Sequence, residues 1–270
     1  MRNSNSLSLK ISLLLMGLFL GTLPVCAGMS QDDVRAFESC KAQAEKGDKV
    51  AQFNLGNRYL EGDGVLKDNV NAVAWYRKAA EKGHADAQVN LGACYSNGIG
   101  LPQDPAQGML WYRKAAEKGH APGQYNLGHG YAVGLGAAKD EAEAVHWYLK
   151  SAEQGFAAAQ YNLAQAYNGG NGVTRDSISA VAWYRKAAEQ GHSEAQGGLG
   201  LCYATGDGVA KDAVEAYAYW NLAGIGSKTS KSNLALLETR ISREEVAAGQ
   251  KRTRELRKEI EDKMAANKSK

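Results

Sequence analysis

The sequence predicts an all-α fold, a solenoid of stacked helix-turn-helix repeats, and three observations support this prediction. The same residue types return every 36 positions over most of the chain, without an insertion. Within each 36-residue unit, apolar and small residues follow the i, i+3, i+4, i+7 spacing of two separate helices. Pairs of glycines between the two patterns are followed by an aspartate, as expected of a tight turn that leads into a new helix.

Residues 1–27 are predicted to form a secretory signal peptide. Positive charge precedes an apolar run at residues 11–20, which is too short to span a bilayer. The small residues that end at Ala27 predict cleavage after that position. A lipid anchor on Cys26 is the alternative, but Val25 stands where lipoprotein signals carry a small residue. The expected location is therefore the periplasm or the extracellular space, without a stable membrane anchor.

Residues 28–47 are predicted to form an N-terminal capping helix. An open solenoid has to shield the apolar faces of its end units from water. The segment 31–46 has the pattern of the second helix of a repeat, with Cys40 in the column of Tyr76.

Five complete repeats are predicted over residues 48–227. The most regular columns hold one glutamine, leucine, tyrosine or tryptophan in each repeat. They are Gln52, Gln88, Gln124, Gln160 and Gln196; Leu55, Leu91, Leu127, Leu163 and Leu199; Tyr59, Tyr95, Tyr131, Tyr167 and Tyr203; and Trp75, Trp111, Trp147 and Trp183. Tyr219 and Trp220 replace the tryptophan in the fifth repeat.

The first helix of each repeat is predicted to pack through the face that carries Gln52, Leu55, Gly56 and Tyr59 in the first repeat. A glycine in the middle of a helix costs about 1 kcal/mol relative to alanine. A close approach by a neighbouring helix is the expected compensation. In the second helix, tryptophan and tyrosine alternate with alanines, so that rings can fill the space beside small residues.

Each loop between the two helices predicts both a turn and a helix start. The paired glycines permit positive φ, and the aspartate that follows is placed to cap the second helix. These aspartates are Asp68, Asp104, Asp140, Asp176 and Asp212. Pro105 stands at the first helical position, where a missing N–H costs nothing. Glu143 and Glu215 lie three residues after their aspartates, which predicts capping boxes.

Residues 228–270 are predicted to form C-terminal capping helices. Residues 231–240 have the pattern of a shortened helix, and Ser242 with Glu245 predicts a capping box that opens a helix from Arg243 to about Lys263. This part of the chain holds twelve basic and seven acidic residues. A solvated capping helix is the favoured interpretation, and binding to an acidic partner or to lipid headgroups is the alternative.

The repeated pattern is similar to the Sel1-like repeat, a relative of the tetratricopeptide repeat. The segments AQVNLGACYSNGIGLPQD and GMLWYRKAAEKGH carry the resemblance, which covers all five units. The resemblance implies a right-handed superhelix that mediates protein interactions. It also implies, for exported bacterial members, roles as adaptors, regulators or host-contact factors.

The candidate binding site is the concave face, which the first helices of such scaffolds line. One column holds an asparagine in the first four repeats, at Asn54, Asn90, Asn126 and Asn162, and a glycine, Gly198, in the fifth. This asparagine column could bind the backbone of an extended segment, or could serve contacts between repeats. Columns that vary between repeats are candidates for specificity. Their aromatic residues suit a binding hot spot, and the alternative is that they cover the seam between helices. The candidate partner-binding residues are Asn54, Asn57, Asn90, Tyr125, Asn126, His129, Tyr161, Asn162 and Gln165.

The composition and motifs favour binding over catalysis. The formal charge of +3 predicts no nucleic-acid partner, and the expected partner is a protein or a peptide whose identity the sequence leaves open, as it does the oligomeric state. The residues after position 27 contain no Ser-x-x-Lys, Gly-x-Ser-x-Gly or His-Glu-x-x-His motif. No catalytic residue or cofactor is therefore predicted. The alternative function, binding or hydrolysis of β-lactams, comes only from the resemblance to cysteine-rich relatives.

Histidines and cysteines are not predicted to form a metal site or a long-range disulfide. His84, His120 and His192 share one column, and equivalent positions in stacked repeats lie about 8–10 Å or more apart, too far to bind one ion. Cys94 and Cys202 share a column three repeats apart and are expected to be too distant for a disulfide. A pairing of Cys40 with Cys94 stays open.

Overall fold

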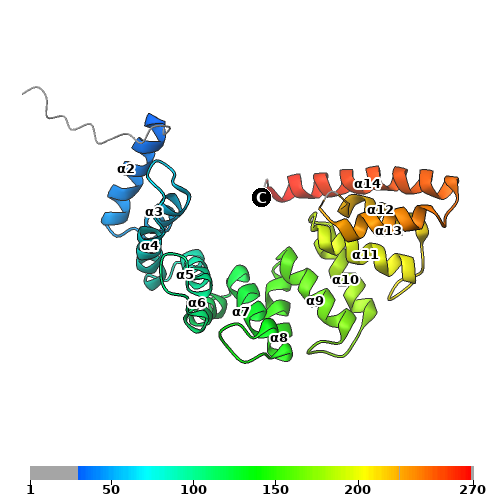
Figure 1. The fold of residues 1–270 in the computed structure, drawn as a ribbon, viewed down its shortest axis with the longest axis horizontal. Helices are drawn as coiled ribbons and strands as arrows, with labels where there is room; N and C mark the ends of the chain where they lie inside the picture. Colours follow the sequence, from blue (N-terminus) through cyan, green and yellow to red (C-terminus); the bar gives the residue numbers. More distant parts are fainter. Residues whose placement is uncertain (1–29, 225, 269–270) are drawn as a thin grey trace, which may run out of the picture.

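A computed structural model describes residues 30–224 and 226–268, and within them helices are the only regular secondary structure. The helices are α2 (Gln31–Glu45), α3 (Lys49–Glu61), α4 (Asn69–Glu81), α5 (Ala85–Asn97), α6 (Pro105–Glu117), α7 (Ala121–Val133), α8 (Glu141–Glu153), α9 (Ala157–Gly169), α10 (Ser177–Ala188), α11 (Ser193–Thr205), α12 (Ala213–Ala223), α13 (Lys228–Glu238) and α14 (Arg243–Lys268). They follow one another along an arc, with α2 at one end and α12 to α14 at the other (Figure 1). The predicted solenoid of helix pairs is confirmed. The predicted signal peptide lies outside the described residues.

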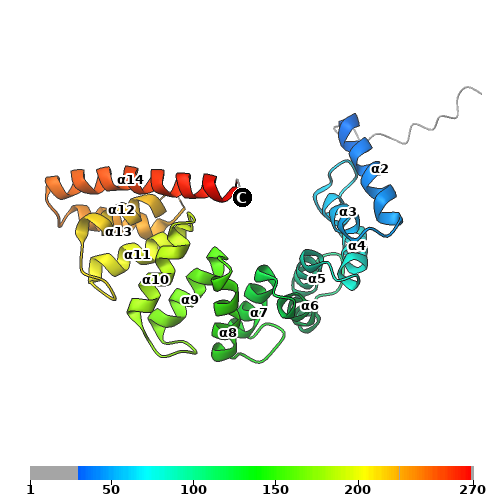
Figure 2. The same ribbon diagram turned by 180° about the vertical axis from the view of Figure 1, so that it is seen from behind.

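From α2 to α13 each helix packs mainly against the helices before and after it in the chain, whereas α14 packs against α12. The odd-numbered helices α3 to α11 are the first helices of the repeats, and the even-numbered helices α4 to α12 are the second helices. The first helices α5 and α7 also contact each other. Seen from behind, the same order of helices from α2 to α11 follows the arc, and α14 runs back over α12 and α13 (Figure 2).

The mid-helix glycines allow the close helix approach that the sequence predicts. A Cβ atom added at Gly56 would lie 2.6 Å from the ring of Tyr76, and one at Gly92 would lie 2.7 Å from the ring of Tyr112. The leucine column is fully buried beside these contacts, with no exposed side-chain surface at Leu127 or at its equivalents. The core therefore consists of large second-helix rings that lie directly on first-helix backbone.

The glutamine column forms hydrogen bonds between consecutive repeats. Each Nε2 atom donates to an alanine carbonyl oxygen near the end of the preceding second helix, at 3.0–3.2 Å. In the third repeat, the Oε1 atom of Gln124 accepts a hydrogen bond from Gln154 at 2.7 Å. In the second repeat, Lys118 stands in the column of Gln154, and the buried Oε1 atom of Gln88 has no partner among the described residues.

Changing Lys118 to glutamine is expected to stabilise the protein by about 0.5 to 1 kcal/mol, because the new amide can donate to Gln88 Oε1. Urea unfolding followed by circular dichroism at 222 nm measures the change. Lys46→Gln is the matched control, since Lys46 occupies the same column ahead of the first repeat. An equal shift of the midpoint in both variants would show that loss of positive charge, and not the hydrogen bond, is responsible.

The aspartate caps are confirmed, but the two predicted capping boxes at Glu143 and Glu215 are wrong. All five aspartate side chains accept hydrogen bonds from backbone N–H groups of the following helix. The Glu143 carboxylate instead accepts from Trp147 Nε1 at 2.8 Å, and the Glu215 carboxylate pairs with Arg252 at 2.7 Å. In both cases the aspartate N–H donates to a tyrosine carbonyl of the preceding helix, so a glutamate has no N–H to cap.

The C-terminal helices pack against the fifth repeat. Helix α13 begins earlier than the sequence predicts, at Lys228. Helix α14 begins as predicted behind a capping box, in which Ser242 N donates to the Glu245 carboxylate at 2.8 Å, and it continues beyond Lys263 to Lys268. It lies along α12 and buries Leu256 there (Figures 1 and 2). Ion pairs of α14 with Glu215 of α12 and with Glu189, the residue that ends α10, add to this packing.

Candidate functional site

All nine candidate binding residues lie on first helices, from α3 to α9. We call the solvent-facing side chains of α3, α5, α7, α9 and α11 the first-helix surface. Asn54, His129 and Gln165 are exposed on it, and the other six candidates are half-buried. The contacts of each residue decide how much of this surface is free to bind a partner.

The asparagine column largely serves contacts within the protein. The Tyr76 hydroxyl donates to Asn57 Oδ1 at 2.6 Å, and Asn90 Nδ2 donates to the same oxygen at 3.3 Å. Asn126 Nδ2 donates to the carbonyl oxygen of Pro122 in its own helix, at 2.8 Å. Of the column, Asn54 is the exposed member.

Asn162 also serves a contact within the protein, because its side-chain amide interacts with the hydroxyl of Tyr148 in the preceding second helix. Burial raises the pKa of Tyr148 to about 12, as it does for Tyr76, so both hydroxyls stay protonated at neutral pH. The asparagines of repeats two and four therefore join consecutive repeats. This supports contacts between repeats, rather than binding of an extended segment, as the role of the asparagine column.

The two candidate tyrosines rest on the seams between repeats. The ring of Tyr125 lies 5.2 Å from that of Phe156 and 6.3 Å from that of His129, measured between ring centroids. The ring of Tyr161 stacks on that of His192 at 5.0 Å. Gln165 Nε2 donates to the Tyr161 hydroxyl at 2.9 Å. The structure thus brings together Tyr125 with His129 and Tyr161 with Gln165, as two neighbouring pairs on α7 and α9.

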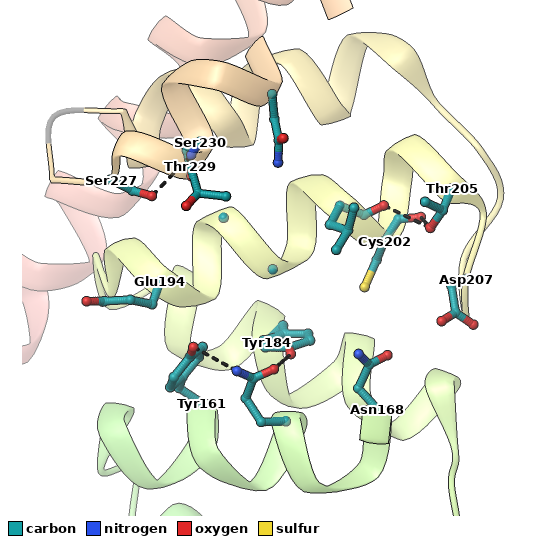
Figure 3. A pocket seen from close by; sticks show the side chains of 15 residues that line it. Tyr161, Asn168, Tyr184, Glu194, Cys202, Thr205, Asp207, Ser227, Thr229 and Ser230 are labelled. Carbon is teal, nitrogen blue, oxygen red and sulfur yellow. Dashed lines mark hydrogen bonds between the residues drawn. The ribbon is translucent and has the colours of Figure 1, made fainter. Parts of the chain in front are cut away.

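A cavity of about 560 Å³ opens on the first-helix surface where α9, α11 and α13 lie side by side (Figure 3). Tyr161 and Gln165 form part of its wall. Its other lining residues include Gly197, Gly198 and Leu201, which the candidate set does not contain. The sequence signal for this cavity is the break in the asparagine column at Gly198. The break alone does not predict a cavity, because side chains of α13 have to close it from the other side.

A second hollow of about 660 Å³ lies between α2 and α3. Asn54 and Asn57 line it together with charged residues of α3 and the loop that follows, among them Arg58 and Asp63. Arg58 and Asp63 form an ion pair at 2.9 Å. The candidate residues therefore border hollows at both ends of the repeat array.

Two histidines of the column cap helices, and the third, His120, contacts an aspartate of the preceding repeat instead. The Nδ1 atoms of His84 and His192 each accept a hydrogen bond from a backbone N–H at 3.3 Å, and His120 Nε2 lies 3.0 Å from Asp86 Oδ1. Across residues 30–224 and 226–268, no group of three or more histidine, cysteine, aspartate or glutamate side chains is placed to hold a metal ion. That the protein needs no cofactor stays a prediction.

The three cysteines of the described residues are free thiols. Cys94 and Cys202 are buried, and burial raises the pKa of each to about 11, which disfavours the nucleophilic thiolate. Cys40 is half-buried, and its thiol donates to the carbonyl oxygen of Ala51 at 3.5 Å. In the part of the chain that the structure describes, no helix has the length and apolar character needed to cross a membrane.

Comparison with known proteins matches a family to every repeat. The model of the Sel1 repeat matches residues 49–84, 85–120, 121–156, 157–192 and 193–224. Among solved structures, a Sel1 repeat protein from Oxalobacter formigenes is 33% identical, with a TM-score of 0.69 over 80% of this chain and 93% of that chain. A protective antigen of uropathogenic Escherichia coli strains is 30% identical, with a TM-score of 0.55. The match covers 87% of this chain but only 58% of the antigen. No curated protein matches the chain.

Proposed function

Because the chain belongs to the Sel1 repeat family, we propose that it is an exported scaffold that binds another protein or a peptide through its first-helix surface. It acts as an adaptor, a regulator or a neutralising binder, and no residue is assigned a catalytic role. The predicted signal peptide at residues 1–27 supports export. The description of a related protein as a protective antigen of uropathogenic strains is a second support.

One observation carries the proposal: repeated columns hold the solenoid together, while the variable column that contains His129, Gln165 and Leu201 is exposed to solvent at these three positions. Leu127 is fully buried, whereas His129, two positions further along the same helix, is exposed beside the ring of Tyr125. Packing within the solenoid does not dictate such exposed, variable positions, so they are available for specificity. The tyrosine next to His129 offers rigid contact area with a polar end, which suits a protein interface.

Photo-crosslinking from the first-helix surface tests this function. A benzophenone amino acid placed at His129, on first helix α7, is expected to give one discrete protein adduct in cells that make the protein. The matched control is the same amino acid at His146, which is exposed on the second helix α8 of the same repeat. The adduct is expected in the periplasmic or extracellular fraction, on a chain whose intact mass corresponds to a start at Gly28.

The yields at the two positions decide whether the first-helix surface binds a partner. Adducts of equal yield from His129 and His146, or the absence of a discrete adduct from both, would contradict binding through the first-helix surface. An adduct that is found only in the cytoplasm, on a chain that still carries residues 1–27, would contradict export.

A further inference from the structure

The fifth repeat lacks two side chains that the other repeats place on the first-helix surface. The third repeat has Tyr125 and Asn126 at these positions, and the fourth has Tyr161 and Asn162. The fifth has Gly197 followed by Gly198, both on α11. The cavity of about 560 Å³ lies over this double glycine, with α11 between α9 and α13 (Figure 3).

The floor of the cavity is backbone and the edge of a buried ring. A Cβ atom at Gly198 would lie 2.9 Å from Tyr184 Cε1, and one at Gly197 would lie 2.9 Å from Ser230 Oγ. The carbonyl oxygen of Gly197 accepts a hydrogen bond from Trp220 Nε1 at 3.1 Å, which holds this stretch of backbone in place. An asparagine at position 198, as in the other four repeats, would occupy the floor.

The wall of the cavity combines apolar surface with amide groups. Tyr161 and Leu201 supply apolar surface, and Leu201 is 48% exposed although it is a large aliphatic residue. Gln165, Asn168 and Asn233 supply side-chain amides from α9 and α13. Such a site suits a guest side chain with an apolar stem and a polar end.

The charged residues that line the cavity are both acidic, and one of them has no cationic partner within residues 30–224 and 226–268. Asp207 pairs with Arg175 at 2.8 Å. The Glu194 carboxylate lies 3.4 Å from Nδ1 of His192, but that nitrogen accepts a hydrogen bond from the backbone N–H of Ala195 and so carries no proton. Burial also lowers the pKa of His192, which keeps the ring neutral at pH 7. The side chain of Glu194 is 65% exposed at one end of the cavity (Figure 3).

We propose that this cavity is a specificity pocket that takes a basic side chain, lysine or arginine, of the bound protein. The inference rests on the proposed function and adds the chemistry of one contact to it. The aliphatic stem packs over Gly198, between Tyr161 and Leu201, and the cation reaches the Glu194 carboxylate. Only the fifth repeat offers this combination, because an asparagine fills the equivalent position in each of the other four.

Titration of the ¹⁵N-labelled protein with short peptides tests the proposal by NMR. The probes are the acetylated, amidated pentapeptide Ala-Ala-Lys-Ala-Ala and its norleucine counterpart, which has the same stem without the charge. The lysine peptide is expected to shift the amide signals of Gly197 and Gly198 in a saturable way. The norleucine peptide is expected to bind about fivefold more weakly, the upper range for one exposed ion pair.

Two variants separate the charge from the cavity. Glu194→Gln is expected to abolish the preference for lysine over norleucine, and Gly198→Asn is expected to abolish the shifts with either peptide. Asp86→Asn is the matched control, because Asp86 occupies the column of Glu194 on α5, where Val89 and Asn90 stand in place of the two glycines. This control is expected to keep both the shifts and the preference.

Equal affinity for the two peptides, or shifts that survive Gly198→Asn in a folded protein, would overturn the proposal. A loss of preference in Asp86→Asn as large as in Glu194→Gln would overturn it as well, since it would indicate a general effect of charge. These results are independent of any natural partner. An adduct at His129 without a preference for the lysine peptide would leave the proposed function standing and remove only the pocket.

Discussion

Replacing Gly172 by alanine is expected to destabilise the protein by about 3 to 5 kcal/mol, whereas the same change at Gly170 is expected to cost about 1 to 2 kcal/mol. Both glycines belong to the loop between α9 and α10, and both have positive φ, 70° and 73°. The left-handed conformation therefore penalises alanine equally at the two positions. Their surroundings account for the expected difference.

Gly172 lies against the backbone of the preceding repeat. A Cβ atom there would come within 2.1 Å of the carbonyl oxygen of Glu141, at the start of α8, whereas the nearest atom at Gly170 is 3.4 Å away. The backbone at a helix start cannot move aside as a flexible side chain can, so the fourth repeat has to shift away from the third. Gly172→Ala is thus a test of the contact between repeats, and Gly170→Ala is its control within the same loop.

Urea unfolding followed by circular dichroism at 222 nm measures both variants. In a solenoid each repeat is stabilised by its neighbours, so a weakened contact in the middle of the array is also expected to split the transition of Gly172→Ala into two. Equal midpoints for the two variants would mean that the second glycine of the loop is needed only for its backbone conformation.

Replacing Leu127 by alanine is expected to destabilise the protein by about 2 to 5 kcal/mol. Leu127 has no exposed surface and packs in a cluster with Tyr112 and Trp147, which come from the second helices on either side of it. The surrounding rings lie on glycine backbone and cannot move to fill the cavity that the change leaves. The loss of stability is therefore expected in the upper part of that range.

Leu201→Ala is the matched control for the leucine column, because Leu201 also lies on a first helix but is 48% exposed. Its change is expected to cost less than about 0.5 kcal/mol. Thermal and urea unfolding of the two variants give the comparison. A similar loss of stability in both variants would show that these leucines stabilise their own helices. Burial between repeats would then not be the main contribution of Leu127 to stability.

Local chemistry allowed most of the fold to be predicted. A helix start depends on the few residues around it, so the aspartate caps and the positive φ of the loop glycines follow from sequence alone. The capping boxes at Glu143 and Glu215 failed for a tertiary reason. The backbone N–H that each glutamate would have capped already donates to a carbonyl of the preceding helix, and Arg252 draws Glu215 towards α14.

The candidate site was predictable in its helices but not in the use of each residue. The sequence placed Asn90 and Asn162 on first helices, where an asparagine can bind either a guest or a neighbour. The structure shows that Asn90 hydrogen-bonds to Asn57 and that Asn162 interacts with Tyr148, residues 33 and 14 positions away. Which partner an amide finds depends on the distance between repeats, and no pattern within a single repeat encodes that distance.

What the sequence by itself determined is the repeated unit: its length, its two helices, its turn and its packed face, because each depends on residues within one helical turn or one loop. What only the tertiary structure decided is the surface between units. The cavity over Gly197 and Gly198 exists because α13 stands beside α11 as a further first helix would, and because the ring of Tyr184 fills the space below. Missing side chains create a cavity only where the neighbouring elements stay apart, and their spacing is set by the packing of the whole array.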